Sequence, residues 1–272
     1  MLGQRLGRLP WVLCCLLLIV VACDRKQEPG AATLRIAVAS DLRFAMEDLV
    51  ADFSERRSED LAKAQIQITY GSSGNFYAQI AQRAPFDMFF SADVLYPRKL
   101  AEQGLALEKS LFEYAIGRIV IWAPKDSPIA VEELQWEALK AARARRIAIA
   151  NPDHAPYGQA AVAAMKTAGV YEELEKKLVF GENIAQAAQF IDSGAAEIGI
   201  IALALAVAPA MADKGRYWEI PVEAFPTMVQ GAMITKWTKH PELAREFRAY
   251  MLSEHGRTIL KRYGFYLPEG KP

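Results

Sequence analysis

Short apolar runs alternate with amphipathic helical patterns along most of this chain, and this alternation restricts its fold more than any other feature. Helical spacing of apolar residues covers 46–53 and again 184–191, and a last helix is expected over 241–251. Seven runs have the apolar, β-branched composition of buried strands: residues 34–39, 66–70, 87–90, 116–122, 146–150, 198–201 and 231–234. The pattern predicts an α/β fold with mostly parallel sheets flanked by helices.

Two segments, 117–123 and 220–231, are candidates for crossing points between two lobes. The second contains Pro221 and Pro226, which disfavour a continuous central strand. A cleft between two lobes can close around a small ion and bury it. The expected lobes are residues 33–116 plus 229–272 for lobe I and residues 117–228, with the hinge segments, for lobe II.

The first 22 residues have the pattern of a secretory signal. A positively charged start precedes an apolar run from Trp11 to Ala22, which is too short to span a membrane. The run ends in Val-Val-Ala-Cys23, which resembles the bacterial lipobox, in which the cysteine becomes the lipidated first residue. We therefore expect removal of residues 1–22, lipid on Cys23 and a flexible tether over 23–32. An uncleaved signal anchor is the alternative.

The residues around this processing site indicate a location. Asp24 directly follows the lipidated position, which resembles the signal for retention at the inner membrane, so we expect a periplasmic protein anchored there. Cys14 and Cys15 would leave with the signal, so the mature chain would have neither a disulfide nor thiol chemistry.

The charge balance excludes one class of partner. The chain has 32 basic and 32 acidic residues, and it contains no run of lysine or arginine. It therefore lacks the electrostatic pattern of a nucleic-acid-binding protein. We expect a monomer, in which any anion site must act locally.

One motif occurs three times: a buried strand, a short turn containing serine, glycine or proline, and then a helix. It covers residues 36–41, 69–75 and 150–158. In a parallel sheet each such turn lies at the carboxyl end of a strand, where α/β proteins bind ligands. A helix N-terminus there offers unpaired N–H groups and the positive end of the helix dipole. One such serine is usually only an N-cap, but three such turns favour an anion site.

Motifs of other chemistry are missing from the sequence. It has no Gly-x-Ser-x-Gly, no phosphate-binding loop, no His-Glu-x-x-His and no Cys-x-x-Cys, and its three histidines are not spaced as a metal cluster. We therefore expect neither an enzyme nor a directly bound metal ion. Two alternatives stay open: a periplasmic serine hydrolase with Ser40 or Ser73 as nucleophile, and a ligand-sensing domain that signals to a membrane partner.

At Ser40, Ser73, Pro156-Tyr157-Gly158 and Glu182-Asn183-Ile184 the chain resembles the periplasmic molybdate-binding protein family of ABC transporters. The resemblance implies a type II, two-lobed periplasmic-binding-protein fold, in which two strands cross between lobes as a hinge. It also implies molybdate or tungstate as ligand, no cofactor, and the permease of an ABC importer as partner. The similar segments cover essentially the whole mature chain: AVASDLRFAMEDL, YGSSGNFYAQIAQRAPFDMFFSAD, IAIANPDHAPYGQAA, GENIAQAAQFIDSGAAEIGII and RTILKRYGF.

The resemblance implies a set of ligand residues. Ser40 and Ser73 match serine ligands of the first lobe, each of which gives a hydroxyl and a backbone N–H. Tyr157 and Ile184 match positions of the second lobe that give backbone N–H groups. Asp41 matches a position where some members use a polar residue whose amide touches the ion.

One departure from the family pattern affects the second lobe. Many members have a tyrosine directly after the Gly-Ile-x strand, hydrogen-bonded to an oxo group, where this chain has Ala202. Tyr157 or Asn183 is expected to compensate, and Ser72 is a further supporting candidate.

A site built only of donors suits a fully deprotonated dianion. Each charge-assisted hydrogen bond contributes about 1.5–3 kcal/mol, so about six or seven offset desolvation of the ion without a cationic side chain. An Asp41 carboxylate inside the cleft would repel molybdate and favour hydrogen phosphate, which carries a proton. We expect this carboxylate to point outward and complement the helix dipole. Binding of phosphate or sulfate is the alternative.

Overall fold

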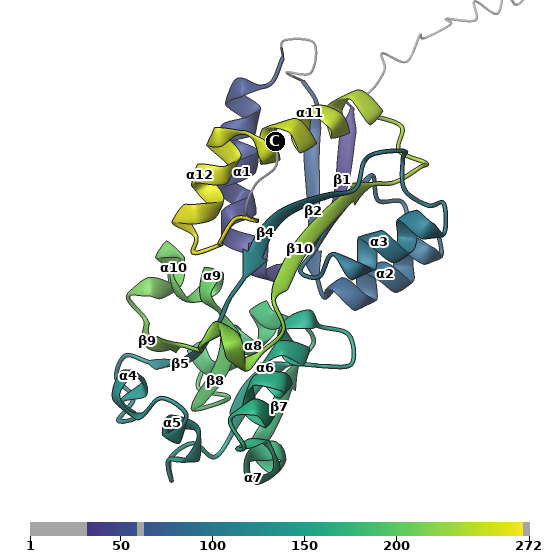
Figure 1. Ribbon diagram of the computed structural model, residues 1–272. Coiled ribbons are helices and arrows are strands. Elements are labelled where there is room, and N and C mark those ends of the chain that lie inside the picture. The colour runs from purple at the N-terminus through teal and green to yellow at the C-terminus, as the bar shows by residue number, and fades with distance from the viewer. Residues whose placement is uncertain (1–31, 59–62, 269–272) are drawn as a thin grey trace, which may run out of the picture. The chain divides into compact units, whose positions relative to one another are not determined.

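The computed structural model describes residues 32–58 and 63–268, which belong to one compact unit (Figure 1). The predicted signal peptide, Cys23 and all but the last residue of the predicted tether lie outside the described residues. Within the described ranges, no helix is long and apolar enough to cross a membrane.

The first sheet has five strands in the order β2-β1-β3-β10-β4. β1 is parallel to both β2 and β3, whereas β10 is antiparallel to both β3 and β4. Its strands are β1 (Thr33–Ala39), β2 (Gln65–Gly71), β3 (Met88–Ser91), β4 (Phe112–Gly117) and β10 (Met228–Ile234).

The second sheet has the order β7-β6-β8-β5-β9. β6 is parallel to β7 and β8, whereas β5 is antiparallel to β8 and β9. Its strands are β5 (Ile119–Pro124), β6 (Ile147–Ala150), β7 (Leu178–Gly181), β8 (Ile198–Ala202) and β9 (Gly215–Glu219).

Both sheets are mixed, so the expectation of mostly parallel sheets is wrong. Among the described residues, four strand pairs are parallel and four are antiparallel. Each antiparallel pair involves either β5 or β10, the two strands that directly follow a passage of the chain from one sheet to the other. The predicted strand over 116–122 is likewise two strands in different sheets, interrupted at Arg118.

The helices flank the sheets as expected for an α/β fold. In Figure 1, α1, α11 and α12 gather beside one face of the first sheet, and α2 and α3 lie beside the other. The predicted helices over 46–53, 184–191 and 241–251 are confirmed by α1, α8 and α11. The longer helices are α1 (Arg43–Arg56), α2 (Ser73–Ala81), α3 (Leu95–Glu102), α6 (Pro156–Thr167), α8 (Ile184–Asp192), α11 (Pro241–Leu252) and α12 (Glu254–Arg262).

Short helices connect the remaining elements. Some occupy the ends of strands, and η1 joins β1 directly to α1. They are η1 (Ser40–Leu42), α4 (Val131–Leu134), α5 (Glu137–Lys140), α7 (Tyr171–Leu174), η3 (Glu175–Lys177), α9 (Leu203–Ala206), α10 (Pro209–Ala212) and η4 (Val222–Ala224).

The core follows the alternation of side chains along the strands. In β1, Leu34, Ile36 and Val38 pack against the side of α1, whereas Ala37 packs on the opposite face with residues of α2 and α3. Burial of each large apolar side chain contributes about 1.5–3 kcal/mol. The strands thus hold their carboxyl ends, and the turns that follow them, in fixed positions.

We call residues 32–58, 63–117 and 228–268 the first-sheet half and residues 118–227 the second-sheet half, after the sheet that each carries. The chain passes between them at Arg118 and again over 220–227. The lobe boundaries expected from the sequence stay a prediction.

Candidate functional site

Four predicted ligand residues lie where a strand ends and a helix begins. Ser40 opens η1 after β1, and Ser73 is the first residue of α2 after β2. Tyr157 is the second residue of α6, and Ile184 is the first residue of α8, which follows β7. All four are buried, with 1–3% of their surface exposed. Their backbone N–H groups belong to the first turn of a helix, where N–H groups lack an acceptor within the helix.

Contacts between the halves bring these junctions together. The Ser40 hydroxyl accepts a 3.3 Å hydrogen bond from the Ala185 N–H at the start of α8. The Gly74 N–H donates to the His154 carbonyl oxygen at 2.8 Å. A Cβ at Gly74 would lie 2.6 Å from that oxygen, so the approach requires glycine. The starts of η1 and α2 therefore face the starts of α8 and α6.

Polar side chains add a second layer of contacts at the same place. The Ser72 hydroxyl lies 2.9 Å from His154 Nδ1, and Asn75 Nδ2 donates to Glu182 Oε1 at 2.5 Å. Glu182 Oε2 is also 3.8 Å from His154 Nε2. Ser72, a supporting candidate, thus contacts the second-sheet half.

The side chains of Ser73 and Asn183 form hydrogen bonds within their own halves. The Ser73 hydroxyl accepts from the Ala92 N–H at 3.0 Å. Asn183 is the N-cap of α8, and its Oδ1 accepts from the Gln186 N–H at 3.1 Å. Asn183 therefore fixes the start of α8, and Ile184 follows it.

The orientation expected for Asp41 is wrong. Asp41 is 1% exposed, and its Oδ2 accepts hydrogen bonds from the Tyr157 hydroxyl at 2.9 Å and from Gln230 Nε2 at 2.7 Å. Gln230 Nε2 also lies 3.0 Å from the Tyr157 hydroxyl oxygen. The carboxylate points inward, where these donors from α6 and β10 bond its Oδ2.

Burial sets the protonation of this cluster. Desolvation raises the pKa of Asp41 to about 6, although hydrogen bonds from Gln230 and Tyr157 oppose the rise. Burial and the Asp41 charge also raise the pKa of Tyr157 well above its ordinary value. Asp41 Oδ1 and Gln230 Oε1 are buried without a hydrogen-bond partner among the described residues.

Ala202, which stands where the resemblance implies a tyrosine, ends β8 and is fully buried. The Tyr157 hydroxyl cannot simply take the place of that tyrosine, because it is bonded to Asp41 and Gln230. The group of Tyr157 that remains predicted to bind a ligand is therefore its backbone N–H at the start of α6.

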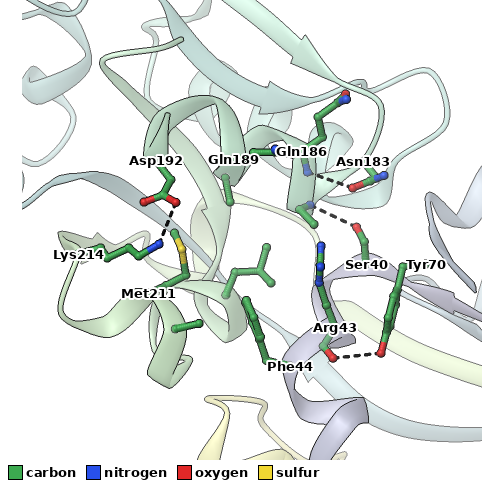
Figure 2. A pocket seen from close by; sticks show the side chains of 14 residues that line it. Ser40, Arg43, Phe44, Tyr70, Asn183, Gln186, Gln189, Asp192, Met211 and Lys214 are labelled. Carbon is green, nitrogen blue, oxygen red and sulfur yellow. Dashed lines mark hydrogen bonds and ion pairs between the residues drawn. The ribbon is translucent and has the colours of Figure 1, made fainter. Parts of the chain in front are cut away.

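A pocket of about 440 Å³, lined by both polar and apolar side chains, adjoins Ser40. Figure 2 shows Arg43 and Tyr70 on one side of it and α8 residues on the other. Arg43, Gln230 and Lys214 were not predicted from the sequence. Gln230 could have been noticed as a polar residue directly before the predicted strand 231–234, and Arg43 as a cation three residues after Ser40.

Comparisons with known proteins show the family of this chain. A model of the bacterial extracellular solute-binding protein family matches residues 34–266. The molybdate-binding protein ModA of Azotobacter vinelandii is 33% identical over 237 residues, 87% of this chain and 91% of that protein. The molybdate-binding protein ModA of Rhodobacter capsulatus is 33% identical over 87% of this chain and 89% of that protein.

Solved structures confirm the expected fold. The periplasmic molybdate-binding protein of Azotobacter vinelandii has a TM-score of 0.80 and 34% identity, over 87% of this chain and 100% of that one. The sulfate-binding protein SubI of Mycobacterium tuberculosis has a TM-score of 0.71 at 14% identity, over 88% of both chains, and supports the fold alone. The individual ligand residues remain predictions.

Proposed function

Because the chain belongs to the bacterial extracellular solute-binding protein family and is a homologue of molybdate-binding proteins, we propose that it binds molybdate or tungstate between its two halves. It then delivers the oxyanion to the permease of an ABC importer.

The observation that carries this proposal is the meeting of four helix starts from both halves. The 3.3 Å contact between Ser40 and the Ala185 N–H joins η1 to α8, and the contact between Gly74 and His154 joins α2 to the turn before α6. Each helix N-terminus presents N–H groups that have no acceptor within the helix and a partial positive charge of about +0.5. An XO₄ dianion held there would receive donors from Ser40, Ser73 and the starts of α6 and α8.

Neutral donors are sufficient to hold such an ion. Each charge-assisted hydrogen bond contributes about 1.5–3 kcal/mol, so several together offset the cost of dehydrating the dianion. Selection of molybdate against sulfate then depends on the size of the site, since molybdate and sulfate are both doubly charged. Molybdate and tungstate present nearly the same size and charge to a ring of donors.

The buried Asp41 favours a second candidate ligand, hydrogen phosphate. Its Oδ1 is a buried acceptor without a donor among the described residues, and the proton of hydrogen phosphate could supply one. A fully deprotonated oxyanion would instead require Asp41 itself to be protonated, because two buried anions repel each other.

The serine-hydrolase alternative loses support. Among the described residues, the recorded partners of the Ser40 and Ser73 hydroxyls are backbone N–H groups, of Ala185 and Ala92. Neither hydroxyl is hydrogen-bonded to a histidine there, so neither serine has an evident general base.

We also propose that Cys23 carries lipid and anchors the mature protein to the periplasmic face of the inner membrane, as the sequence pattern predicts. Metabolic labelling with a palmitate analogue tests this directly. The label should appear on the wild-type protein and disappear in Cys23→Ser.

A thermal-shift panel of molybdate, tungstate, sulfate, phosphate and thiosulfate tests the proposed ligand class. A ligand at 100 times its Kd stabilises the fold by about 2.7 kcal/mol. Molybdate and tungstate should give the largest shifts, and Ser73→Ala should shrink them. A large shift with phosphate alone would identify the second candidate, and no shift with any of the five would contradict oxyanion binding.

A further inference from the structure

The pocket beside Ser40 reaches one of the four residues of the proposed oxyanion site. Its lining includes Ser40, which is 2% exposed, and also Arg43 and Lys214, which are exposed. The first-sheet half contributes η1, the start of α1 and Tyr70, and the second-sheet half contributes α8 and the segment around α10. An ion that enters here can therefore reach the Ser40 hydroxyl.

One of the two cationic side chains in the pocket lining, Arg43, has no ion pair among the described residues. Lys214 is neutralised by Asp192, with 2.9 Å between Nζ and Oδ2. The Arg43 guanidinium makes no hydrogen bond or ion pair within the described part of the chain, and Figure 2 shows its side chain reaching from α1 toward Ser40 and α8. No carboxylate in the pocket lining is left to pair with it, since Asp192 is bonded to Lys214.

The size of the pocket distinguishes it from the proposed inner site. A water molecule occupies about 30 Å³ in the liquid, so the 440 Å³ pocket has room for an oxyanion together with much of its hydration shell. The inner site, made of buried helix starts, would take the ion without water. The two regions share Ser40.

We propose that this pocket is an outer capture site, in which Arg43 pairs with a hydrated oxyanion before the ion loses its water at Ser40. The destination of the ion rests on the proposed function, whereas the capture step depends on the pocket alone. A cation at the rim of a cleft raises the association rate, and added salt screens its effect.

Stopped-flow measurement of molybdate binding, followed by intrinsic fluorescence at several ionic strengths, tests the kinetic part. Arg43→Gln should lower the association rate constant roughly three- to tenfold at low salt, flatten its salt dependence and leave the dissociation rate within about twofold. Arg43→Lys should retain most of the wild-type rate. Lys99→Gln is the matched control: it removes one exposed positive charge from α3, outside this pocket, and should change neither rate.

An unchanged association rate in Arg43→Gln would overturn the inference. An effect of Arg43→Gln confined to faster dissociation would also overturn it, because Arg43 would then hold the bound ion rather than capture it.

A second measurement separates this inference from the proposed function. In ¹⁵N NMR spectra the Arg43 Nε–H signal, assigned by its absence from Arg43→Gln, should shift with millimolar molybdate even in Ser73→Ala, where the inner site is weakened. If no oxyanion bound tightly to the wild-type protein, the proposed function would fail, but this millimolar response would still support the capture site. An unresponsive Arg43 signal would refute the capture site whatever the inner site binds.

Discussion

The Tyr157 hydroxyl donates a 2.9 Å hydrogen bond to Asp41 Oδ2, which joins the start of α6 to η1 across the two halves of the molecule. Both residues are almost fully buried, and Gln230 from β10 completes the cluster. A contact between an acid and a phenol at this place couples the association of the halves to the protonation of Asp41.

Removal of the Tyr157 hydroxyl should destabilise the protein. Tyr157→Phe leaves the buried Asp41 carboxylate with one donor fewer, and an unsatisfied buried polar group costs about 1–3 kcal/mol. Urea unfolding at pH 7 measures the loss. Tyr266→Phe is the control, because Tyr266 is half exposed and its ring would remain over Arg118. Equal stability of the two variants would contradict the role of the Tyr157 hydroxyl.

Asp41 should make stability depend on pH. Its pKa is raised from 3.8 to about 6 in the folded protein, so between these values the unfolded chain loses its proton first. Stability from this group is therefore complete below about pH 4 and falls as the pH rises to 6, by about 3 kcal/mol at 1.36 kcal/mol per pKa unit. Asp41→Asn should raise the free energy of unfolding at pH 7 and leave it almost unchanged at pH 4.

Asp52 provides a control of opposite sign. The hydrogen bond from Arg56 lowers the pKa of Asp52, so its contribution is present above its unfolded pKa and lost as the pH falls. Asp52→Asn should therefore weaken the protein at pH 7. If Asp41→Asn behaved in the same way, Asp41 would be stabilised as a carboxylate, against the present account.

Oxyanion affinity should rise as the pH falls from 8 to 6. A dianion beside buried Asp41 favours the protonated acid, so binding takes up close to one proton and affinity changes by up to tenfold per pH unit above the pKa of Asp41. Calorimetry in two buffers with different ionisation enthalpies counts that proton. In Asp41→Asn the uptake should vanish; a wild-type affinity that is flat across this range would show that Asp41 stays ionised.

Gly74→Ala should weaken ligand binding more than folding. The added Cβ would meet the backbone of His154 at 2.6 Å, and backbone cannot move aside as a flexible side chain can. The halves would then meet less closely, and a loss of tenfold in affinity corresponds to about 1.4 kcal/mol. Gly104→Ala offers the reverse test: that position has open space but a φ of +71°, so stability should fall and affinity should not.

The sequence predicted the parts of this architecture that depend on local pattern. The buried strands β1, β3, β6 and β8 are nearly continuous apolar runs, and α1 and α8 carry regular apolar stripes. β7 and β9 were missed because their residues are mostly half exposed and lack such a run. The prediction of mostly parallel sheets failed at β5 and β10, because strand direction depends on where the chain crosses between sheets and not on local composition.

For the candidate site too, the sequence predicted the features that depend on local pattern and missed those that depend on distant contacts. The strand–turn–helix motif located the buried turns around Ser40, Ser73 and Tyr157, because helix starts have recognisable residues. It could not orient Asp41, since an aspartate at a helix start usually faces solvent. The donors that turn Asp41 inward, Tyr157 and Gln230, are 116 and 189 residues away in the chain. Contacts between residues so far apart in the chain leave no recognisable pattern in the local sequence.

Anomalous diffraction at the molybdenum edge, from crystals grown with molybdate, tests the central claim most directly. We predict a single strong peak between the two halves, with the oxygens of the ion within about 3 Å of the hydroxyls of Ser40 and Ser73 and the N–H groups of Tyr157 and Ile184. A peak elsewhere, or none between those four helix starts, would contradict oxyanion capture at this site.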